Sequence, residues 1–235
     1  MRLLGQRKYR HGLYRGVAAT IEHSGALRSL ELRTVVDVGA NLGQFSLLAW
    51  QLFPGAKIHA FEPQRGPAEV FLKLFPPSSP ARLYRAAIGT RSGEIEMHIS
   101  RRHDSSSLLP ISQAMTTVFP GTEEVGRERV SVAPLASFLS AEDIAAPALL
   151  KIDVQGAELD VLQGCGELLE RFRYVYVELS FVVLYVGQAL CGEVIAYLAG
   201  RGFRLRGVHN LSEDRQGQAI QADFLFVRDG APAPS

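Results

Sequence analysis

Apolar residues follow two patterns that alternate along the chain. Short apolar runs, typical of buried strands, occur at Val35–Val38, Lys57–Phe61, Arg82–Ile88, Leu149–Ile152 and Tyr174–Leu179. Apolar positions at helical spacing predict helices over Gln44–Phe53, Pro67–Phe75, Gln155–Arg171 and Gly192–Gly200. Strands that alternate with helices predict an α/β fold of three layers, with a mostly parallel sheet between two layers of helices.

The end of the chain breaks this alternation. Phe203–Val208 and Ala222–Val227 have the composition of strands, and no helical pattern lies between them. Strands joined without a crossover helix pair antiparallel. The sheet is therefore expected to carry one antiparallel edge strand.

The chain before the first strand is basic at its start and weakly helical from about Gly16 to Leu32. We expect residues 1–33 to form an N-terminal helical extension or cap. Three interpretations of this segment are open: it forms a lid, it makes a dimer contact, or it is a solvated helix packed on the sheet edge. Residues 34–229 are expected to form the main domain, and residues 230–235, rich in Pro and Ala, a flexible tail.

The middle of the chain also departs from the alternation. Glu94–Ser100 alternates like a half-exposed strand and is expected to pair with its neighbour as a hairpin after Ser92-Gly93, and Val130–Ala133 returns to strand character. Between them, Arg101–Arg127 shows no regular pattern and is interrupted by serines, prolines and a glycine. A loop of this length is usually functional or disordered, so it is interpreted as a substrate-facing lid or as a plainly mobile loop.

The first strand runs into a turn with two glycines, Asp37-Val38-Gly39-Ala40-Asn41-Leu42-Gly43. Such a turn lets a ligand approach backbone N–H groups at the start of a helix. Three residues separate Gly39 from Gly43, which is not the G-x-G-x-x-G spacing of dinucleotide-binding folds and disfavours a nicotinamide oxidoreductase. An acid followed by G-x-x-x-G suits a cationic nucleotide that carries an amino acid, so S-adenosylmethionine is the expected cofactor and an ordinary tight turn is the alternative.

A second signal for this cofactor lies at the end of the second strand. Glu62 follows the glycine turn by roughly twenty residues, the spacing at which nucleotide-binding α/β folds hold the ribose hydroxyls. Ala87, at the end of the third strand, is expected at the adenine edge. The residues expected to bind the cofactor are Asp37, Gly39, Ala40, Asn41, Gly43, Phe45, Glu62, Pro63, Ala87 and Asp153.

Composition excludes several classes of protein. In 235 residues, 47% are hydrophobic, 21% are charged and the net charge is +1, so nucleic acid is not the expected partner. Cys165 and Cys191 are too few and too isolated for a disulfide framework or a zinc site, which favours a reducing, cytoplasmic location. No apolar run reaches the length of a membrane span, and the basic start lacks the apolar core of a secretory signal.

Several segments together resemble the FkbM family of class I S-adenosylmethionine-dependent methyltransferases. The residues that carry the resemblance are Val36-Asp37-Val38-Gly39-Ala40-Asn41-Leu42-Gly43, Phe61-Glu62-Pro63, Ala87-Ile88-Gly89, Ser105-Ser106-Ser107-Leu108, Val177-Glu178-Leu179-Ser180, Leu184-Tyr185 and, most specifically, Lys151-Ile152-Asp153-Val154-Gln155-Gly156-Ala157-Glu158 with Val161-Leu162-Gln163-Gly164. The resemblance covers about residues 35–210. It implies a seven-stranded Rossmann-like sheet and methyl transfer to a hydroxyl of a sugar, a glycan or a polyketide-type natural product. The chain has Leu135-Ala136 where the family often has Leu-Asp, so any role of that acid is in doubt here.

Methyl transfer to a hydroxyl needs a group that takes the proton or polarises the oxygen. Asp153 ends the fourth parallel strand and is expected to face the methyl group as a general base or a metal ligand, unless it merely caps the next helix. Glu178 is its expected partner, and two carboxylates would suit magnesium. His103 and His209 are the alternative bases. The expected catalytic residues are thus Asp153, Glu178, His103 and His209.

Two other functions stay open. A silent S-adenosylmethionine-binding or dimerisation module would need no acceptor, although Asp37, Glu62 and Asp153 are all present. An N-methyltransferase of nucleic acid would want an Asn/Asp-Pro-Pro-aromatic turn, and the chain has Asp153-Val154-Gln155-Gly156 there. The expected partner is therefore a small-molecule or glycan hydroxyl, and a homodimer is a further interpretation.

Overall fold

A seven-stranded sheet forms the middle layer of the molecule. The computed structural model describes residues 5–228. The order of the strands across the sheet is β3 (Ala81–Tyr84), β2 (Lys57–Phe61), β1 (Thr34–Val38), β7 (Ala148–Ile152), β8 (Tyr174–Ser180), β10 (Ala219–Arg228) and β9 (Phe203–Glu213). All pairings are parallel except those of β10, which runs antiparallel to both β8 and β9. The predicted mostly parallel α/β sheet with an antiparallel edge is confirmed.

Alternating side chains of the buried strands supply two apolar cores. Val35 and Leu149 point to one face of the sheet, whereas their neighbours Val36 and Leu150 point to the other. All four side chains are fully buried. Burial of one such side chain stabilises the fold by about 1.5–3 kcal/mol, which is why these short runs become central strands.

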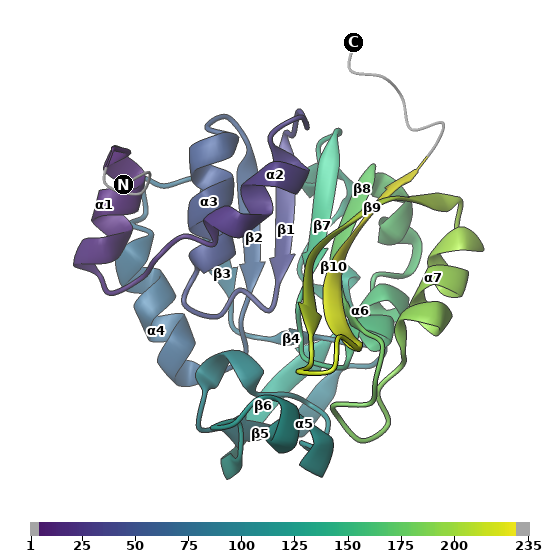
Figure 1. Ribbon diagram of the computed structural model, residues 1–235. Coiled ribbons are helices and arrows are strands. Elements are labelled where there is room, and N and C mark those ends of the chain that lie inside the picture. The colour runs from purple at the N-terminus through teal and green to yellow at the C-terminus, as the bar shows by residue number, and fades with distance from the viewer. Residues whose placement is uncertain (1–4, 229–235) are drawn as a thin grey trace.

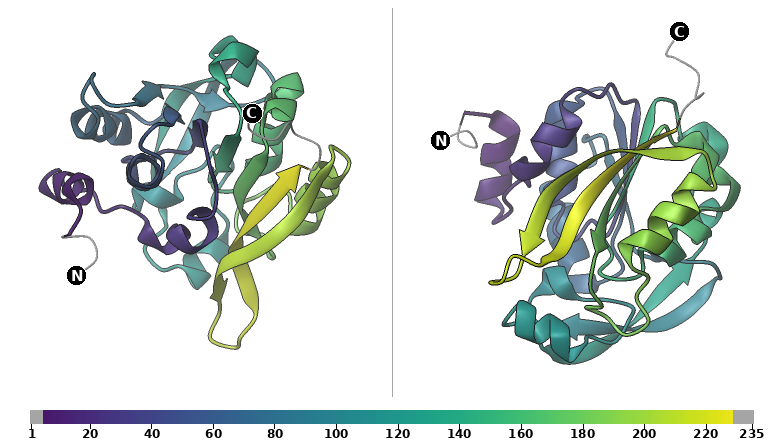
Figure 2. Two further views of the ribbon diagram at one scale, coloured as in Figure 1. Left: turned by 90° about the horizontal axis from the view of Figure 1, so that it is seen from above. Right: turned by 45° about the vertical axis from the view of Figure 1, so that its right-hand side comes forward.

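Each core is closed by its own layer of helices. The first face carries α1 (Arg7–Tyr14), α2 (Ser24–Leu27), α3 (Gln44–Leu52) and α4 (Arg65–Leu74). The second face carries α6 (Glu158–Gly164) and α7 (Cys191–Ala199). The view from above in Figure 2 shows the sheet between these two layers.

The N-terminal segment differs from its prediction. A helix was expected from about Gly16 to Leu32, but α1 ends before Gly16, and a 3₁₀ turn (Ile21–His23) and the short α2 follow. Gly16 has φ +75°, a left-handed conformation that breaks the helical path. Val17 and Leu27 are buried in the first core, so the segment packs on the sheet face as part of the domain.

A small second sheet corrects two predictions about the middle of the chain. It consists of β4 (Ala87–Ile88), β6 (Glu124–Ala133) and β5 (Gly93–Ser100), in that order. The predicted strand over Arg82–Ile88 is wrong, because the chain leaves the main sheet after Tyr84 and pairs Ala87 with Val132. The predicted hairpin is also wrong, because β5 pairs with the distant β6 and not with the strand before it.

The segment between β5 and β6 is more regular than expected. It contains a 3₁₀ turn (His103–Ser105) and α5 (Gln113–Val118), whose first turn is capped by the Ser112 hydroxyl, which accepts a hydrogen bond from Met115 N. Met115 is buried against Leu184, Tyr185 and Ile220. The expectation of an irregular loop over Arg101–Arg127 is therefore wrong, and an anchored segment takes its place.

Figure 1 shows the small sheet and α5 beneath the end of the main sheet to which β1 and β2 point. This end holds the carboxyl termini of the parallel strands, where ligands bind in open α/β folds. Within residues 5–228, no helix is long and apolar enough to cross a membrane. The tail predicted at 230–235 lies outside the described residues.

Candidate active site

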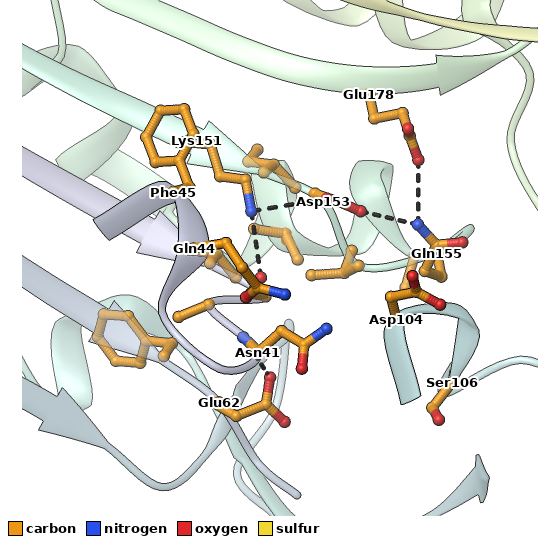
Figure 3. A pocket seen from close by; sticks show the side chains of 18 of the residues that line it. Asn41, Gln44, Phe45, Glu62, Asp104, Ser106, Lys151, Asp153, Gln155 and Glu178 are labelled. Carbon is orange, nitrogen blue, oxygen red and sulfur yellow. Dashed lines mark hydrogen bonds and ion pairs between the residues drawn. The ribbon is translucent and has the colours of Figure 1, made fainter. Parts of the chain in front are cut away.

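A cavity of about 350 Å³ lies at the carboxyl ends of β1, β2, β7 and β8. Its walls include the glycine turn after β1, Glu62 after β2, Asp153 after β7 and Glu178 in β8. Figure 3 shows Glu62 at one side of this cavity and Glu178 and Gln155 at the other, with Lys151 and Asp153 between them. The volume is within the range of about 300–1,000 Å³ of small-molecule sites.

The turn after β1 is held between its two neighbouring strands. The Gly39 and Ala40 N–H groups both donate to Phe61 O, at 3.0 and 2.9 Å. A Cβ atom on Gly39 would lie 1.8 Å from the Asp153 carbonyl oxygen, and the φ of Gly39 is +80°. Gly39 is therefore required by the close approach of the β7 backbone, which fixes the turn at the cavity wall.

Glu62 is a buried acid that holds two backbone N–H groups. It is 3% exposed, and it accepts hydrogen bonds from Asn41 N at 2.9 Å and Gln64 N at 2.8 Å. Burial raises the pKa of Glu62 to about 7, although these two hydrogen bonds act in the opposite direction. The carboxyl group thus links the turn after β1 to the start of α4 and titrates near neutral pH.

Asp37 does not line the cavity, contrary to its expected place among the cofactor-binding residues. It is 0% exposed, and its carboxylate accepts a hydrogen bond from Ser46 Oγ at 2.7 Å and lies 3.1 Å from Lys151 Nζ. Its side chain points toward α3, where Ser46 lies. Asp37 therefore acts on the cavity through Lys151, which does line it.

Lys151 is a cavity cation that the sequence did not single out. Its ammonium group donates to Gly39 O at 3.1 Å and lies 3.7 Å from Asp153 Oδ2. Burial alone would lower the pKa of Lys151, but the Asp37 and Asp153 carboxylates outweigh it and the pKa is raised. Lys151 thus remains charged at the centre of the site.

Gly43 also lies outside the cavity lining. It precedes α3 with φ +93°, and a Cβ atom there would come within 2.8–2.9 Å of the Phe75 and Phe71 rings. The requirement for glycine is therefore set by the packing of α3 on α4. Phe45, two residues later, does line the cavity, as do the predicted Ala40, Asn41, Pro63 and Ala87.

Asp153 and Glu178 are joined by one amide. The Gln155 Nε2 donates to Asp153 Oδ1 at 2.8 Å and to Glu178 Oε2 at 3.0 Å. The Tyr185 hydroxyl lies 2.8 Å from Gln155 Oε1, and Gln221 Nε2 donates to Glu178 Oε1 at 2.9 Å. The structure therefore brings the two predicted catalytic carboxyl groups together through a glutamine that the sequence did not reveal.

The proton balance of this pair is set by burial and by like charges. Burial, followed by the Asp153 and Asp223 carboxylates, raises the pKa of Glu178 well above its usual value. The Asp153 side chain is 39% exposed at the cavity wall, where an acceptor hydroxyl can reach it.

The two histidines have different positions. His103 is exposed and lines the cavity from the 3₁₀ turn after β5. His209 lies within β9, which is longer than the predicted strand, and it does not line the cavity. Its ring lies 6.4 Å from that of Tyr176.

The N-terminal segment closes one side of the cavity. Thr20, Glu22 and His23 all line it. The His23 Nδ1 lies 3.0 Å from the Tyr176 hydroxyl and 3.1 Å from Asp223 Oδ2. Residues more than 150 positions apart thus meet at this wall, and no local sequence pattern marks them.

A second cavity, of about 230 Å³, adjoins the first. Asp104, Asp153, Gln155 and Glu178 line both, so these four side chains lie where the two cavities meet. Within residues 5–228, no group of three or more His, Cys, Asp or Glu side chains is arranged to hold a metal ion.

The first cavity fits S-adenosylmethionine. Asn41 Oδ1 and Thr20 Oγ1 are buried at its walls and have no hydrogen-bond partner within residues 5–228, so they are free to bind a polar ligand. Glu62 offers a carboxyl group for hydroxyls, and Gly39, Ala40 and Asn41 of the turn line the cavity beside it. These groups would hold the ribose and the amino-acid portion of the cofactor.

Comparison with known proteins finds similarity to methyltransferases. The Methyltransferase FkbM domain matches residues 37–205. The chain is 28% identical to 2-O-methyltransferase NoeI of Sinorhizobium fredii over 190 residues, which cover 77% of this chain and 78% of that protein. It is 30% identical to 31-O-demethyl-FK506 methyltransferase FkbM of Streptomyces tacrolimicus over 199 residues, which cover 74% and 75% of the two chains.

Solved structures share the fold at low sequence identity. Sp1610 of Streptococcus pneumoniae, a candidate tRNA (m1A22) methyltransferase solved in complex with S-adenosyl-L-methionine, aligns with a TM-score of 0.50 and 10% identity. The alignment covers 93% of this chain and 76% of that one. From the fold, the cavity and the family match over more than half of its length, the chain belongs to the FkbM family and is an S-adenosylmethionine-dependent methyltransferase.

Proposed function

We propose that this methyltransferase transfers the methyl group to a hydroxyl of a sugar, a glycan or a polyketide-type natural product. The observation that carries the proposal is the Asp153–Gln155–Glu178 arrangement at the meeting point of the two cavities. One cavity fits the cofactor, and the other is open to an acceptor. The carboxyl pair lies between them, where a proton has to be removed.

The chemistry divides between cofactor and protein. S-adenosylmethionine supplies a methyl group on a sulfonium. The bond between this sulfur and the methyl carbon breaks readily, and S-adenosylhomocysteine is the leaving group. A hydroxyl is a poor nucleophile until its proton is taken, so Asp153 would accept that proton as the new O–C bond forms. Glu178 is fixed by two amide groups, and burial and the neighbouring carboxylates raise its pKa, which would disfavour two full negative charges on the pair. The cavity walls and the fixed carboxylate supply the alignment.

The relatives support transfer to oxygen. NoeI is named a 2-O-methyltransferase, and the Streptomyces tacrolimicus protein is named for a 31-O-demethyl substrate. Their acceptors differ, so the names favour the reaction and leave open which acceptor this chain uses. An N-methyltransferase finds no support in either name.

A magnesium ion does not fit this carboxyl pair. Magnesium prefers oxygen ligands in octahedral geometry, whereas the Gln155 amide directs its N–H groups at both Asp153 and Glu178. We therefore place the proton transfer on the carboxylates. Turnover that persists in EDTA is the expected result, and loss of turnover that magnesium restores would contradict it.

The proposal is tested by product identification. The purified protein is incubated with methyl-labelled S-adenosylmethionine and a library of glycans and polyketide-type compounds, and labelled products are identified by mass spectrometry. Each positive acceptor is then compared with its deoxy analogue at the labelled position. Label on a hydroxyl oxygen, lost in the deoxy analogue, is expected. Cofactor binding without transfer to any acceptor would favour a silent binding module instead.

A further inference from the structure

The second cavity has the position of an acceptor site but only modest size. It meets the cofactor cavity at Asp104, Asp153, Gln155 and Glu178, and its volume is about 230 Å³. Sites for drug-sized ligands hold about 300–1,000 Å³. One ring of an acceptor therefore fits inside, with the rest of a larger molecule left outside.

The walls of this cavity are of two kinds. Met115 and Phe119 of the α5 region form an apolar side. Gln221 and Asp104 offer amide and carboxylate groups on the polar side. A sugar ring combines C–H surfaces with hydroxyl groups and is complementary to both walls, whereas a purely apolar ring would leave the polar wall unpaired.

The charges at this cavity are mostly acidic. Asp104, Asp153 and Glu178 are carboxyl groups, and Arg102 is the single cation among the lining residues in the described part of the chain. The Arg102 guanidinium is already bound by Asp104, with Nε and Nη2 at 3.3 and 3.1 Å from the two carboxylate oxygens. Partial burial opposes ionisation of Asp104, yet the Arg102 contacts keep its pKa below the usual value. No free cation in this lining is available to neutralise an anion.

We propose that the second cavity binds the acceptor as an uncharged or cationic polyhydroxylated ring, such as a neutral glycoside or an amino sugar, and that Asp104 makes it reject anionic acceptors. The inference rests on the proposed function, since it names the acceptor class of the same site. It excludes uronic acids and phosphorylated sugars as preferred substrates. Asp104 is the residue that determines this specificity, because it both adds a negative charge and occupies Arg102.

The test uses three matched probes: a methyl hexoside, its 2-amino-2-deoxy analogue and the corresponding hexuronide. Binding of each to the protein loaded with S-adenosylhomocysteine is measured by calorimetry, and methyl transfer is measured separately with S-adenosylmethionine. We expect the hexuronide to bind about tenfold or more weakly than the neutral hexoside, because like charges at short range disfavour it. The amino sugar should bind at least as well as the hexoside.

Two variants assign the preference to Asp104. Asp104→Asn removes the charge and frees Arg102, so the ratio of hexoside to hexuronide affinity should fall about tenfold. Asp160→Asn makes the same change at an exposed position on α6, outside both cavities, and should leave the ratio unaltered. Thermal unfolding of both variants confirms that they fold.

The outcomes separate the inference from the proposed function. Hexuronide affinity equal to or greater than that of the hexoside would overturn the inference, as would failure of all three probes to bind the loaded protein. An unchanged ratio in Asp104→Asn would also overturn the role of that residue. Selective binding of the hexoside without any methyl transfer would uphold the charge preference while contradicting the proposed function.

Discussion

Glu62 is an ionisable residue that lies buried beside the cofactor cavity. Its carboxyl group is 3% exposed and titrates near pH 7, so its charge changes within the physiological range. An ionised carboxylate accepts hydrogen bonds from hydroxyls more strongly than the protonated acid does. The affinity for the cofactor should therefore depend on the ionisation of this one residue.

The first prediction concerns the pH dependence of cofactor binding. Because raising the pH above about 7 deprotonates Glu62, the affinity for S-adenosylmethionine should increase about tenfold between about pH 6 and about pH 8. Glu62→Gln should weaken binding by about 1–3 kcal/mol at the higher pH and remove this part of the pH dependence. Calorimetry across the range measures both. An unchanged affinity and pH profile in the variant would show that Glu62 does not contact the cofactor.

Gln155 gives a second prediction at the residue scale. Gln155→Met removes the N–H groups that donate to Asp153 and Glu178, and loss of this hydrogen bond should raise the pKa of Glu178 further. The ascending limb of the pH profile of kcat should then move to higher pH, while the affinity for S-adenosylmethionine changes little. Gln163→Met, at an exposed position on α6, is the matched control. A limb that stays in place would mean that Gln155 has only a structural role.

Individual residues were predictable from the sequence where a strand end decides their position. Glu62 and Asp153 follow buried strands, Glu178 lies near the end of one, and all three line the cavity. Asp37 precedes the end of its strand, and sequence position alone does not reveal that its side chain turns to Ser46 and Lys151. Gln155 was not foreseen because its role depends on Tyr185, thirty positions away, and on a left-handed φ of +59°.

At the scale of elements, α5 is the piece that shapes the acceptor side. Its buried Met115 fixes it to Leu184, Tyr185 and Ile220, and Phe119 at its end lines the second cavity. The same segment carries Asp104 and Ser106 into the first cavity. Loosening this helix should therefore affect acceptor binding more than cofactor binding.

The third prediction tests this role of α5. Met115→Ala leaves a cavity in a small cluster, and large-to-small changes of this kind cost about 2–5 kcal/mol in a core. We expect faster hydrogen exchange over residues 101–119, an acceptor KM raised about tenfold and a much smaller change in cofactor affinity. Gln113→Ala, exposed on the same helix, is the control. An unaltered acceptor KM, despite faster exchange, would contradict the role of α5 at the acceptor site.

The main strands could be predicted from sequence because central parallel strands are short and apolar on both faces. The small sheet could not, because alternation predicts a strand but not its partner. β5 pairs with β6 across the whole α5 segment, as in Ile95 with Val130. The N-terminal helix was predicted in the wrong place, because weak helical spacing around Gly16 does not show which residues the sheet face will bury.

At the scale of the whole molecule, the strand order separates two tasks at one end of the sheet. β1 and β2 carry the turn and the acid that fit the cofactor, and β7 and β8 carry the carboxyl pair. Thr20, Glu22 and His23 of the N-terminal segment line the first cavity, and the small sheet with α5 lies beneath the main sheet (Figure 1). Cofactor binding and proton removal should accordingly be separable by mutation.

The most direct test of the account is the turnover of Asp153→Asn at saturating S-adenosylmethionine, with cofactor affinity measured on the same preparation. The variant preserves the shape of the side chain but removes the proton acceptor. We predict that kcat falls by roughly a hundredfold or more, the range for loss of a positioned base, while cofactor affinity stays close to that of the native protein. Near-normal turnover would contradict the account, since Asp153 would then only cap the turn before α6.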